Sequence, residues 1–109
     1  NNWDYTVEFR DGFSEDFSLK KPFPNPSFGK PITINLEVIN GQEIATTIYN
    51  ILGQKVWAYT KNYTDSQFNK IIWDGLNMNG KRVSSGLYFI EASGEEKTLR
   101  HKIIFLKDE

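Results

Sequence analysis

The sequence predicts an all-β domain, an antiparallel sandwich of about seven short strands. Three observations predict it. Apolar and polar residues alternate with a period of two in several short runs, turn residues separate the runs, and aromatic residues make up 15% of the chain, which suits a pleated surface. No stretch keeps apolar residues at helical spacing, and alanine, the best helix former, occurs only at Ala45, Ala58 and Ala92.

The N-terminal part begins with a candidate strand over residues 3–9, where Trp3 opens an apolar–polar alternation that Asp11-Gly12 ends. A proline-rich stretch follows. Proline lacks the N–H that a sheet ladder needs, so we expect an extended, unpaired lead-in here and a domain boundary with it. The sequence predicts that residues 1–21 are an N-terminal extension or the end of a preceding domain, and that residues 22–109 form the compact module. The prolines are Pro22, Pro24, Pro26 and Pro31.

The compact module shows regularly spaced strands separated by turns. Asn40-Gly41 predicts a two-residue hairpin, because a type I′ turn needs positive φ at both positions. Leu52-Gly53-Gln54 and Ser93-Gly94 predict further turns. The candidate strands are 32–38, 44–51, 55–63, 68–73, 87–92 and 99–106.

The alternation also predicts which side chains are buried. We expect a core that contains Ile34, Leu36, Ile48, Trp73, Tyr88 and Ile104, with Tyr49 facing the core if its strand has the other register.

Length, charge and cysteine content limit the classes of function. A chain of 109 residues has room for one domain. A net charge of −1 gives no sequence-wide attraction to nucleic acid. No apolar run approaches the roughly 20 residues of a membrane-spanning helix. The absence of cysteine excludes disulfides and is compatible with export. Because the chain starts with neither methionine nor a signal peptide, we expect a fragment of a longer protein.

The residues offer little catalytic or metal-binding chemistry. His101 is the only histidine and lies between Arg100 and Lys102, so we expect an exposed strand histidine. No nucleophile or nucleotide-binding motif occurs.

Carboxylate pairs at Glu95-Glu96 and Asp108-Glu109 fall in a turn and at the terminus. Asn79-Gly80 predicts a tight turn and lacks the carboxylates of a calcium loop. The sequence therefore predicts no catalytic residue, no cofactor and no metal.

Two surface features have alternative interpretations. Trp57, Tyr59 and Tyr63 share one strand parity, so they form either a row of core residues or an aromatic platform for a glycan. The C-terminal strand is basic, which favours a solvated edge protected against aggregation by its lysines. Its cations are Lys97, Arg100, Lys102 and Lys107.

Three segments, taken in order, resemble a known family. The first is Phe17-Ser18-Leu19-Lys20, then Pro24-Asn25-Pro26 and the strand from Ile32. The second is the run from Ile48 to Val56, which contains Asn50 and Gly53. The third is Trp73-Asp74-Gly75, then Asn79-Gly80 and Ser85-Gly86-Leu87-Tyr88-Phe89, and it closes on the basic last strand from Lys102 to Lys107. This order resembles the C-terminal sorting domains of type IX secretion substrates, in particular the subset related to the immunoglobulin-like domain of the flagellar hook-capping protein. The resemblance covers residues 17–107 and implies an immunoglobulin-like sandwich.

The resemblance also implies a function. It implies a non-catalytic module that directs secretion and surface anchoring of a larger exported protein, through the periplasm of a Gram-negative bacterium. The implied partners are the outer-membrane secretion machinery and the passenger domains of the same chain, and the last strand is the part that the machinery reads. The sorting-motif candidates are Pro24, Asn25, Pro26, Gly53, Trp73, Asp74, Gly75, Gly86, Tyr88, Lys102 and Lys107.

Each motif also has a structural interpretation. Pro24-Asn25-Pro26 stiffens the lead-in, Trp73 anchors the core before Gly75 turns the chain, and Gly86 relieves crowding ahead of Tyr88. Two other functions stay open: a carbohydrate-binding accessory domain of a secreted polysaccharide-degrading enzyme, and a structural immunoglobulin-like domain of a cap or filament.

Overall fold

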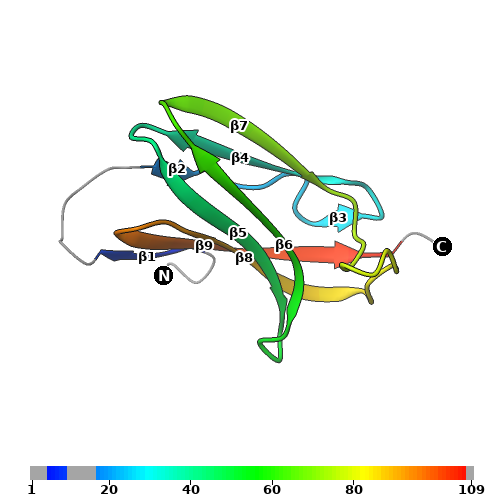
Figure 1. Ribbon diagram of the computed structural model, residues 1–109. Helices are drawn as coiled ribbons and strands as arrows, with labels where there is room; N and C mark the ends of the chain where they lie inside the picture. Colours follow the sequence, from blue (N-terminus) through cyan, green and yellow to red (C-terminus); the bar gives the residue numbers. More distant parts are fainter. Residues whose placement is uncertain (1–4, 10–16, 108–109) are drawn as a thin grey trace.

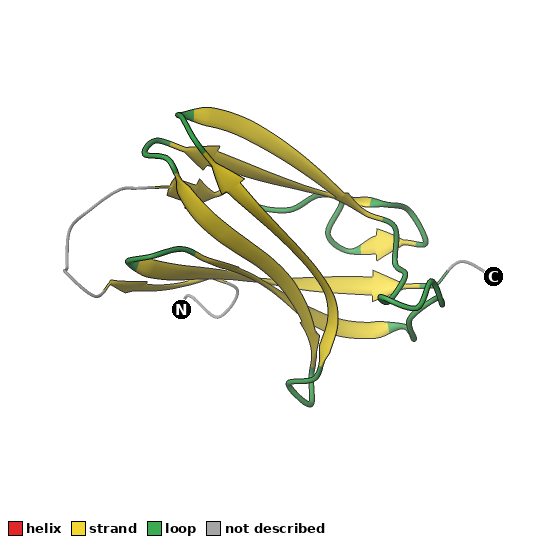
Figure 2. Ribbon diagram, in the orientation of Figure 1, coloured by secondary structure: helices red, strands yellow, loops and turns green. Residues whose placement is uncertain are grey.

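A computed structural model of the protein describes residues 5–9 and 17–107. Within these ranges the chain consists of strands, turns and loops, without a helix (Figure 2). The strands form two facing layers of a β-sandwich (Figure 1). They are β1 (Tyr5–Phe9), β2 (Phe17–Leu19), β3 (Ser27–Phe28), β4 (Ile32–Val38), β5 (Gln42–Asn50), β6 (Lys55–Tyr63), β7 (Gln67–Trp73), β8 (Gly86–Ser93) and β9 (Lys97–Leu106).

The two sheets differ in size. The larger has the order β1-β9-β8-β5-β6, with the short β3 paired to the end of β9, and the smaller has the order β2-β4-β7. The β3–β9 pair is parallel, and every other named pair of strands is antiparallel. The predicted all-β sandwich is confirmed, and β2 and β3 add to the strands expected from the alternation.

The core lies between the sheets and follows the predicted alternation on most strands. On β4 every second residue is buried, which places Ile34 and Leu36 against the larger sheet. Ile48, Trp73 and Tyr88 are also buried, as predicted. Tyr49 is only half-buried, so the alternative register of its strand is excluded.

The prediction for β9 was wrong in its register. Ile103 and Phe105 are fully buried, while Ile104 is half-buried on the outer face of the sheet. His101 belongs to the buried set and is 4% exposed, so the expected exposed histidine was also wrong. The physical reason is the period of two, because fixing one inward residue on a strand fixes the parity of all the others.

The hairpin predicted at Asn40-Gly41 does not form. β4 and β5 belong to different sheets, so this turn carries the chain from one layer to the other. Neither residue has the positive φ of a type I′ turn. Gly41 is needed for a different reason, since a Cβ there would lie 2.7 Å from the carbonyl oxygen of Tyr63. The close approach of two backbones therefore explains this glycine.

The N-terminal strands pair with both sheets. β1 pairs with β9, and β2 pairs with β4 and buries Phe17 and Leu19 in the core. The proline-rich segment is not unpaired, because β3 lies within it and Phe23 bridges to Thr33. Trp3, Asp11-Gly12 and Asp108-Glu109 lie outside the described residues. The boundary at residue 22, as a division of a longer protein, stays a prediction.

Candidate functional site

Two of the sequence motifs meet at one end of the core. The Trp73 ring packs against the Tyr88 ring, with centroids 5.7 Å apart, and against the Phe105 ring at 5.5 Å. The indole Nε1 of Trp73 donates a hydrogen bond to the carbonyl of Leu76 at 2.9 Å, which satisfies the one polar atom of the buried ring. Trp73 therefore anchors the core, as expected, and contacts the last strand directly.

Gly75 lies against the same last strand. Its φ is +82°, and a Cβ built there would collide with the Phe105 ring. Both facts require glycine, the first through backbone conformation and the second through space. Asp74, its neighbour in the motif, is exposed. Gly75 thus links the conformation of the turn after β7 to the packing of Phe105 on β9.

Tyr88 joins this cluster through both its ring and its hydroxyl. The hydroxyl donates a hydrogen bond to the carbonyl of Ser84 at 2.6 Å, and burial raises the pKa of the phenol above its usual value. The expectation that Gly86 relieves crowding was wrong, because a Cβ at Gly86 would meet nothing within 4 Å. Gly53 lies in the β5–β6 turn at a φ of +82°, where the predicted turn is confirmed.

The strand β9 is covered along both of its edges. β8 pairs with one edge over its length. On the other edge β1 pairs with Lys97 to His101, and β3 pairs with Phe105 and Leu106. The interpretation of this strand as a solvated edge was therefore wrong.

Asn25 fills the remaining gap on that edge. Its side-chain Nδ2 donates to the carbonyl of Lys102 at 2.9 Å, and its Oδ1 accepts from the backbone N–H of Ile104 at 2.9 Å. The amide group thus makes the two hydrogen bonds that a neighbouring strand would make. The structure brings the Pro24-Asn25-Pro26 motif directly onto β9, which is a contact between residues 79 apart in sequence.

The outer face of β9 carries the remaining candidates. Lys102 and Ile104 point to this face opposite Phe89 and Leu87 of β8. Arg100 is on the same face and forms a 2.8 Å ion pair with Glu91. Lys107 follows the strand and is exposed, and its backbone N–H donates to the hydroxyl of Ser85 at 2.7 Å. The face is therefore a mixture of half-buried apolar side chains and cations.

The three aromatic residues on β6 do not form one surface. The Trp57 and Tyr59 rings stack at 6.3 Å with an angle of 11°, and Tyr59 is 38% exposed. Tyr63 is 1% exposed, and its hydroxyl accepts a hydrogen bond from Asn69 Nδ2 at 2.7 Å. Tyr63 therefore belongs to the core, and a platform that includes its ring is excluded.

His101 has a structural role. Its Nε2 lies 3.1 Å from the carbonyl oxygen of Leu19, so it ties β9 to β2 across the core. Among residues 5–9 and 17–107, no group of three or more histidine or acidic side chains gathers in a way that could hold a metal ion. The turn at Asn79-Gly80 is confirmed, because Asn77 Oδ1 accepts from the N–H groups of Asn79 and Lys81.

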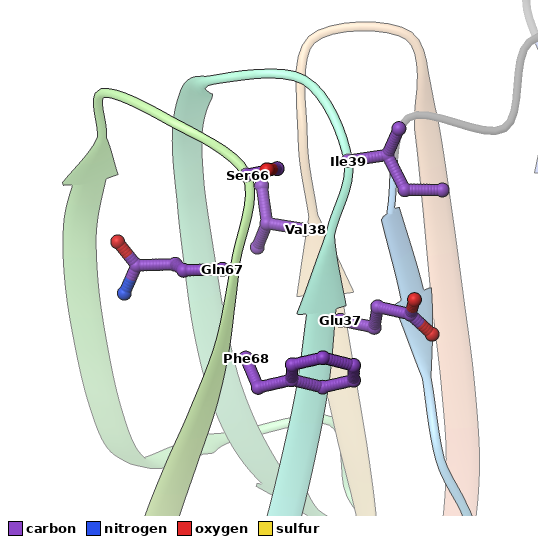
Figure 3. A pocket seen from close by; sticks show the side chains of 6 residues that line it. All are labelled: Glu37, Val38, Ile39, Ser66, Gln67 and Phe68. Atoms are coloured by element: carbon purple, nitrogen blue, oxygen red, sulfur yellow. The ribbon is translucent and has the colours of Figure 1, made fainter.

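A shallow depression of about 240 Å³ lies where β4 ends and β7 begins. Figure 3 shows the Phe68 ring lying across β4 near Glu37, with Ile39 above it and Gln67 pointing to the other side. Phe68 is 77% exposed. None of the sorting-motif candidates lines this depression.

Comparisons with known proteins identify the family. A family profile described as "secretion system C-terminal sorting domain" matches residues 21–106. No curated protein matches the chain. Within the described residues, no helix has the length and apolar character to cross a membrane.

The fold resembles solved structures at low sequence identity. Dimeric latent PorU from Porphyromonas gingivalis has a TM-score of 0.71 at 18% identity, covering 89% of this chain. The chain spans only 10% of that PorU chain. FlgD from Xanthomonas campestris, which acts in flagellar hook capping, matches with a TM-score of 0.56 at 12% identity. The match covers 91% of this chain and 69% of the FlgD chain. FlgD from P. aeruginosa is similar at 0.56 and 13%, covering 90% and 71%.

At these identities the structural likeness shows the fold, an immunoglobulin-like sandwich, and the profile match over most of the chain shows the family. The chain belongs to the family of secretion system C-terminal sorting domains, the sorting domains of type IX secretion.

Proposed function

We propose that this sorting domain directs the export of a passenger protein carried on the same chain, across the outer membrane to the cell surface or beyond. We further propose that the secretion machinery reads the outer face of β9, with Lys102 and Lys107 as the cations that it contacts. The family match supports the sorting role. The arrangement around β9 supports the choice of face.

The coverage of β9 is the observation on which the proposal depends. A partner that recognises a strand in a folded domain either adds a strand at a free edge or contacts side chains on a face. β8 occupies one edge, and β1, Asn25 and β3 together occupy the other. The inner face packs in the core. The outer face is what remains for a partner that meets the domain folded.

The chemistry of that face fits recognition. Arg100 is ion-paired with Glu91, and we assign recognition to Lys102 on the outer face of β9 and to Lys107 just beyond the strand. Ile104 and Leu87 lie beside Lys102 and are only half-buried, which leaves apolar area for a partner to cover. A surface of this kind, with apolar contacts and charge at its margin, matches the composition of protein interfaces.

The test is an export assay in a host with type IX machinery. A reporter is fused ahead of residue 1, so that β1 keeps its place on β9, and the exported fraction is compared with the periplasmic fraction. We expect the unmutated fusion to be exported and the double variant Lys102→Gln with Lys107→Gln to remain in the periplasm.

The matched control is Lys21→Gln with Lys70→Gln, which removes the same charge from two exposed lysines outside β9. Surface charge changes usually alter stability by no more than about 0.5 kcal/mol, so all variants should stay folded. If the unmutated fusion is not exported, the sorting proposal fails. If both double variants behave alike, the role of Lys102 and Lys107 fails while the sorting role stands.

The same proposal holds that the domain itself performs no catalysis. The sorting family is non-catalytic in general, and the role of the chain is recognition and attachment at the surface. Hydrolytic turnover by the purified domain, lost on substitution of one polar residue, would contradict this.

A further inference from the structure

A polar cleft lies between the β5–β6 turn and the loop that precedes β8, away from the outer face of β9. Its volume is about 440 Å³, within the range of small-molecule sites. One wall carries Asn50, Gln54 and Lys55, and the other carries Asn77, Arg82 and Ser84. Tyr88, from the core cluster, also lines the cleft, together with Val56 and Val83. The cleft therefore borders the Gly86-Leu87-Tyr88 motif at the start of β8.

The amide oxygens of the cleft are already occupied. Asn50 Oδ1 accepts from the backbone N–H groups of Leu52 and Gln54 at 2.9 and 3.0 Å. Asn50 Nδ2 donates to Gln54 Oε1 at 2.8 Å, which occupies that oxygen as well. The opposite wall repeats the pattern, because Asn77 Oδ1 accepts from the N–H groups of Asn79 and Lys81 at 2.9 and 3.0 Å.

The groups that remain are mostly donors. The side-chain amide N–H groups of Gln54 and Asn77 have no partner in the described structure, and each can donate. The Lys55 ammonium and the Arg82 guanidinium can only donate. No aspartate or glutamate lines the cleft. A cavity that is rich in donors, poor in acceptors and lined by cations selects a negatively charged acceptor.

The two cations are available to such a ligand. No ion pair joins Lys55 or Arg82 to a carboxylate among residues 5–9 and 17–107, and both side chains are exposed. The Arg82 guanidinium lies over the Phe105 ring, 6.0 Å from its centroid, a contact that favours this position of the side chain. Both walls are turns tied by the internal bonds of Asn50 and Asn77, which makes the cleft preformed.

We propose that this cleft binds an oxyanion, a carboxylate or phosphate group carried by a small polar molecule. Arg82 and Lys55 bind the charge, and the amide N–H groups of Gln54 and Asn77 donate to the oxygens. The volume exceeds that of a single anion, so the ligand has a polar body that fills the rest of the cleft. The inference rests on the cleft alone and holds whether or not β9 is the recognised strand.

The experiment is a titration of the ¹⁵N-labelled domain followed by NMR at low ionic strength, because screening shortens the Debye length to about 8 Å at physiological salt. The probes are inorganic phosphate, glucuronate as a carboxylate with a polyhydroxyl body, and glucose as the neutral control. We expect saturable shifts of the side-chain N–H signals of Gln54, Asn77 and Arg82 with one or both anions, and none with glucose. The two anion arms tell a phosphate site from a carboxylate site.

Single variants locate the binding. Arg82→Gln and Lys55→Gln should each weaken it at least about tenfold, which corresponds to about 1.4 kcal/mol. Lys70→Gln, on the outer face of β7, removes the same charge and should leave affinity unchanged. Lys55→Gln keeps the test decisive if loss of the Arg82 contact with Phe105 disturbs the fold. The proposal is overturned if neither anion gives saturable shifts in the cleft, or if Lys70→Gln weakens binding as much as the cleft variants do.

Discussion

The contact between Gly75 and Phe105 leads to a sharp prediction about stability. Gly75→Ala adds one methyl group at a φ of +82° and drives it into the Phe105 ring. The left-handed backbone costs about 1 to 2 kcal/mol for an L residue, and overpacking a core costs about 1 to 3 kcal/mol. The expected loss is therefore about 2 to 5 kcal/mol of a total stability of about 5 to 15 kcal/mol.

Gly80→Ala is the matched control. Gly80 has a φ of +78°, yet a Cβ there would meet nothing within 4 Å. It should lose the backbone part alone, about 1 to 2 kcal/mol. The difference between the two variants, about 1 to 3 kcal/mol, measures the collision with β9.

Urea unfolding followed by tryptophan fluorescence measures both losses, since Trp73 is buried beside Phe105. With a slope of about 1.5 kcal/mol/M, Gly75→Ala should lower the midpoint by about 1 to 3 M. Phe105→Leu should reduce the effect of Gly75→Ala in a double-mutant cycle, because the smaller side chain makes room for the methyl group. Equal midpoints for Gly75→Ala and Gly80→Ala would refute the reasoning.

Three further predictions test the rest of β9 and the core. Ile103→Ala should lower the free energy of unfolding by about 2 to 5 kcal/mol, and Ile104→Ala should lower it clearly less, as measured by thermal unfolding. The reverse order would favour the register expected from the sequence. Asn25→Ala should make amide hydrogen exchange at Ile104 faster than in the unmutated domain. Asn25→Asp keeps the acceptor oxygen, so the exchange rate at Ile104 should lie between those of the unmutated domain and Asn25→Ala. Equal exchange rates in all three proteins would contradict the edge contact. Burial raises the pKa of Tyr63, so the unfolded chain releases the phenol proton at a lower pH than the folded domain does. The free energy of unfolding should therefore fall as pH rises above about 10, and it should fall less in Tyr63→Phe. An unfolding midpoint that does not change between pH 9 and 11 would contradict this.

Most strands could be predicted from the sequence because their alternation is a local property. The bounds of β4 and β6 agree with the prediction, and Trp73 is in the core. The register of β9 was missed because residues 103–106 are apolar on both parities. A signal was present upstream, where Leu99 alternates with Arg100 and Lys102, and this places the odd-numbered residues inward.

The contacts between distant segments could not be predicted in the same way. Asn25 binds β9 through its side chain, and no local pattern distinguishes that asparagine from one in an ordinary turn. Asn40-Gly41 has the composition of a hairpin turn, yet turn chemistry does not tell whether the chain returns to its own sheet or crosses to the other. The donor-rich cleft was missed for the same reason, because Lys55 and Arg82 come together only through the fold.

The central claim is that the domain is recognised on the outer face of β9 while both edges of this strand stay covered. A disulfide that fastens β1 to β9 tests it most directly. Glu8 and Thr98 are directly opposed, and opposed residues of antiparallel strands have Cα atoms about 4.5 to 5.5 Å apart, within the range for a disulfide. The chain has no other cysteine, so the pair Glu8→Cys and Thr98→Cys has only one way to close.

The measurement is the exported fraction of a reporter fused ahead of this double variant, with the disulfide closed and after reduction. The account predicts equal export in both states, because the fastened edge was never the recognised surface. Retention of the oxidised fusion in the periplasm, with export restored by reduction, would show that the machinery needs the edge of β9 and would contradict the account.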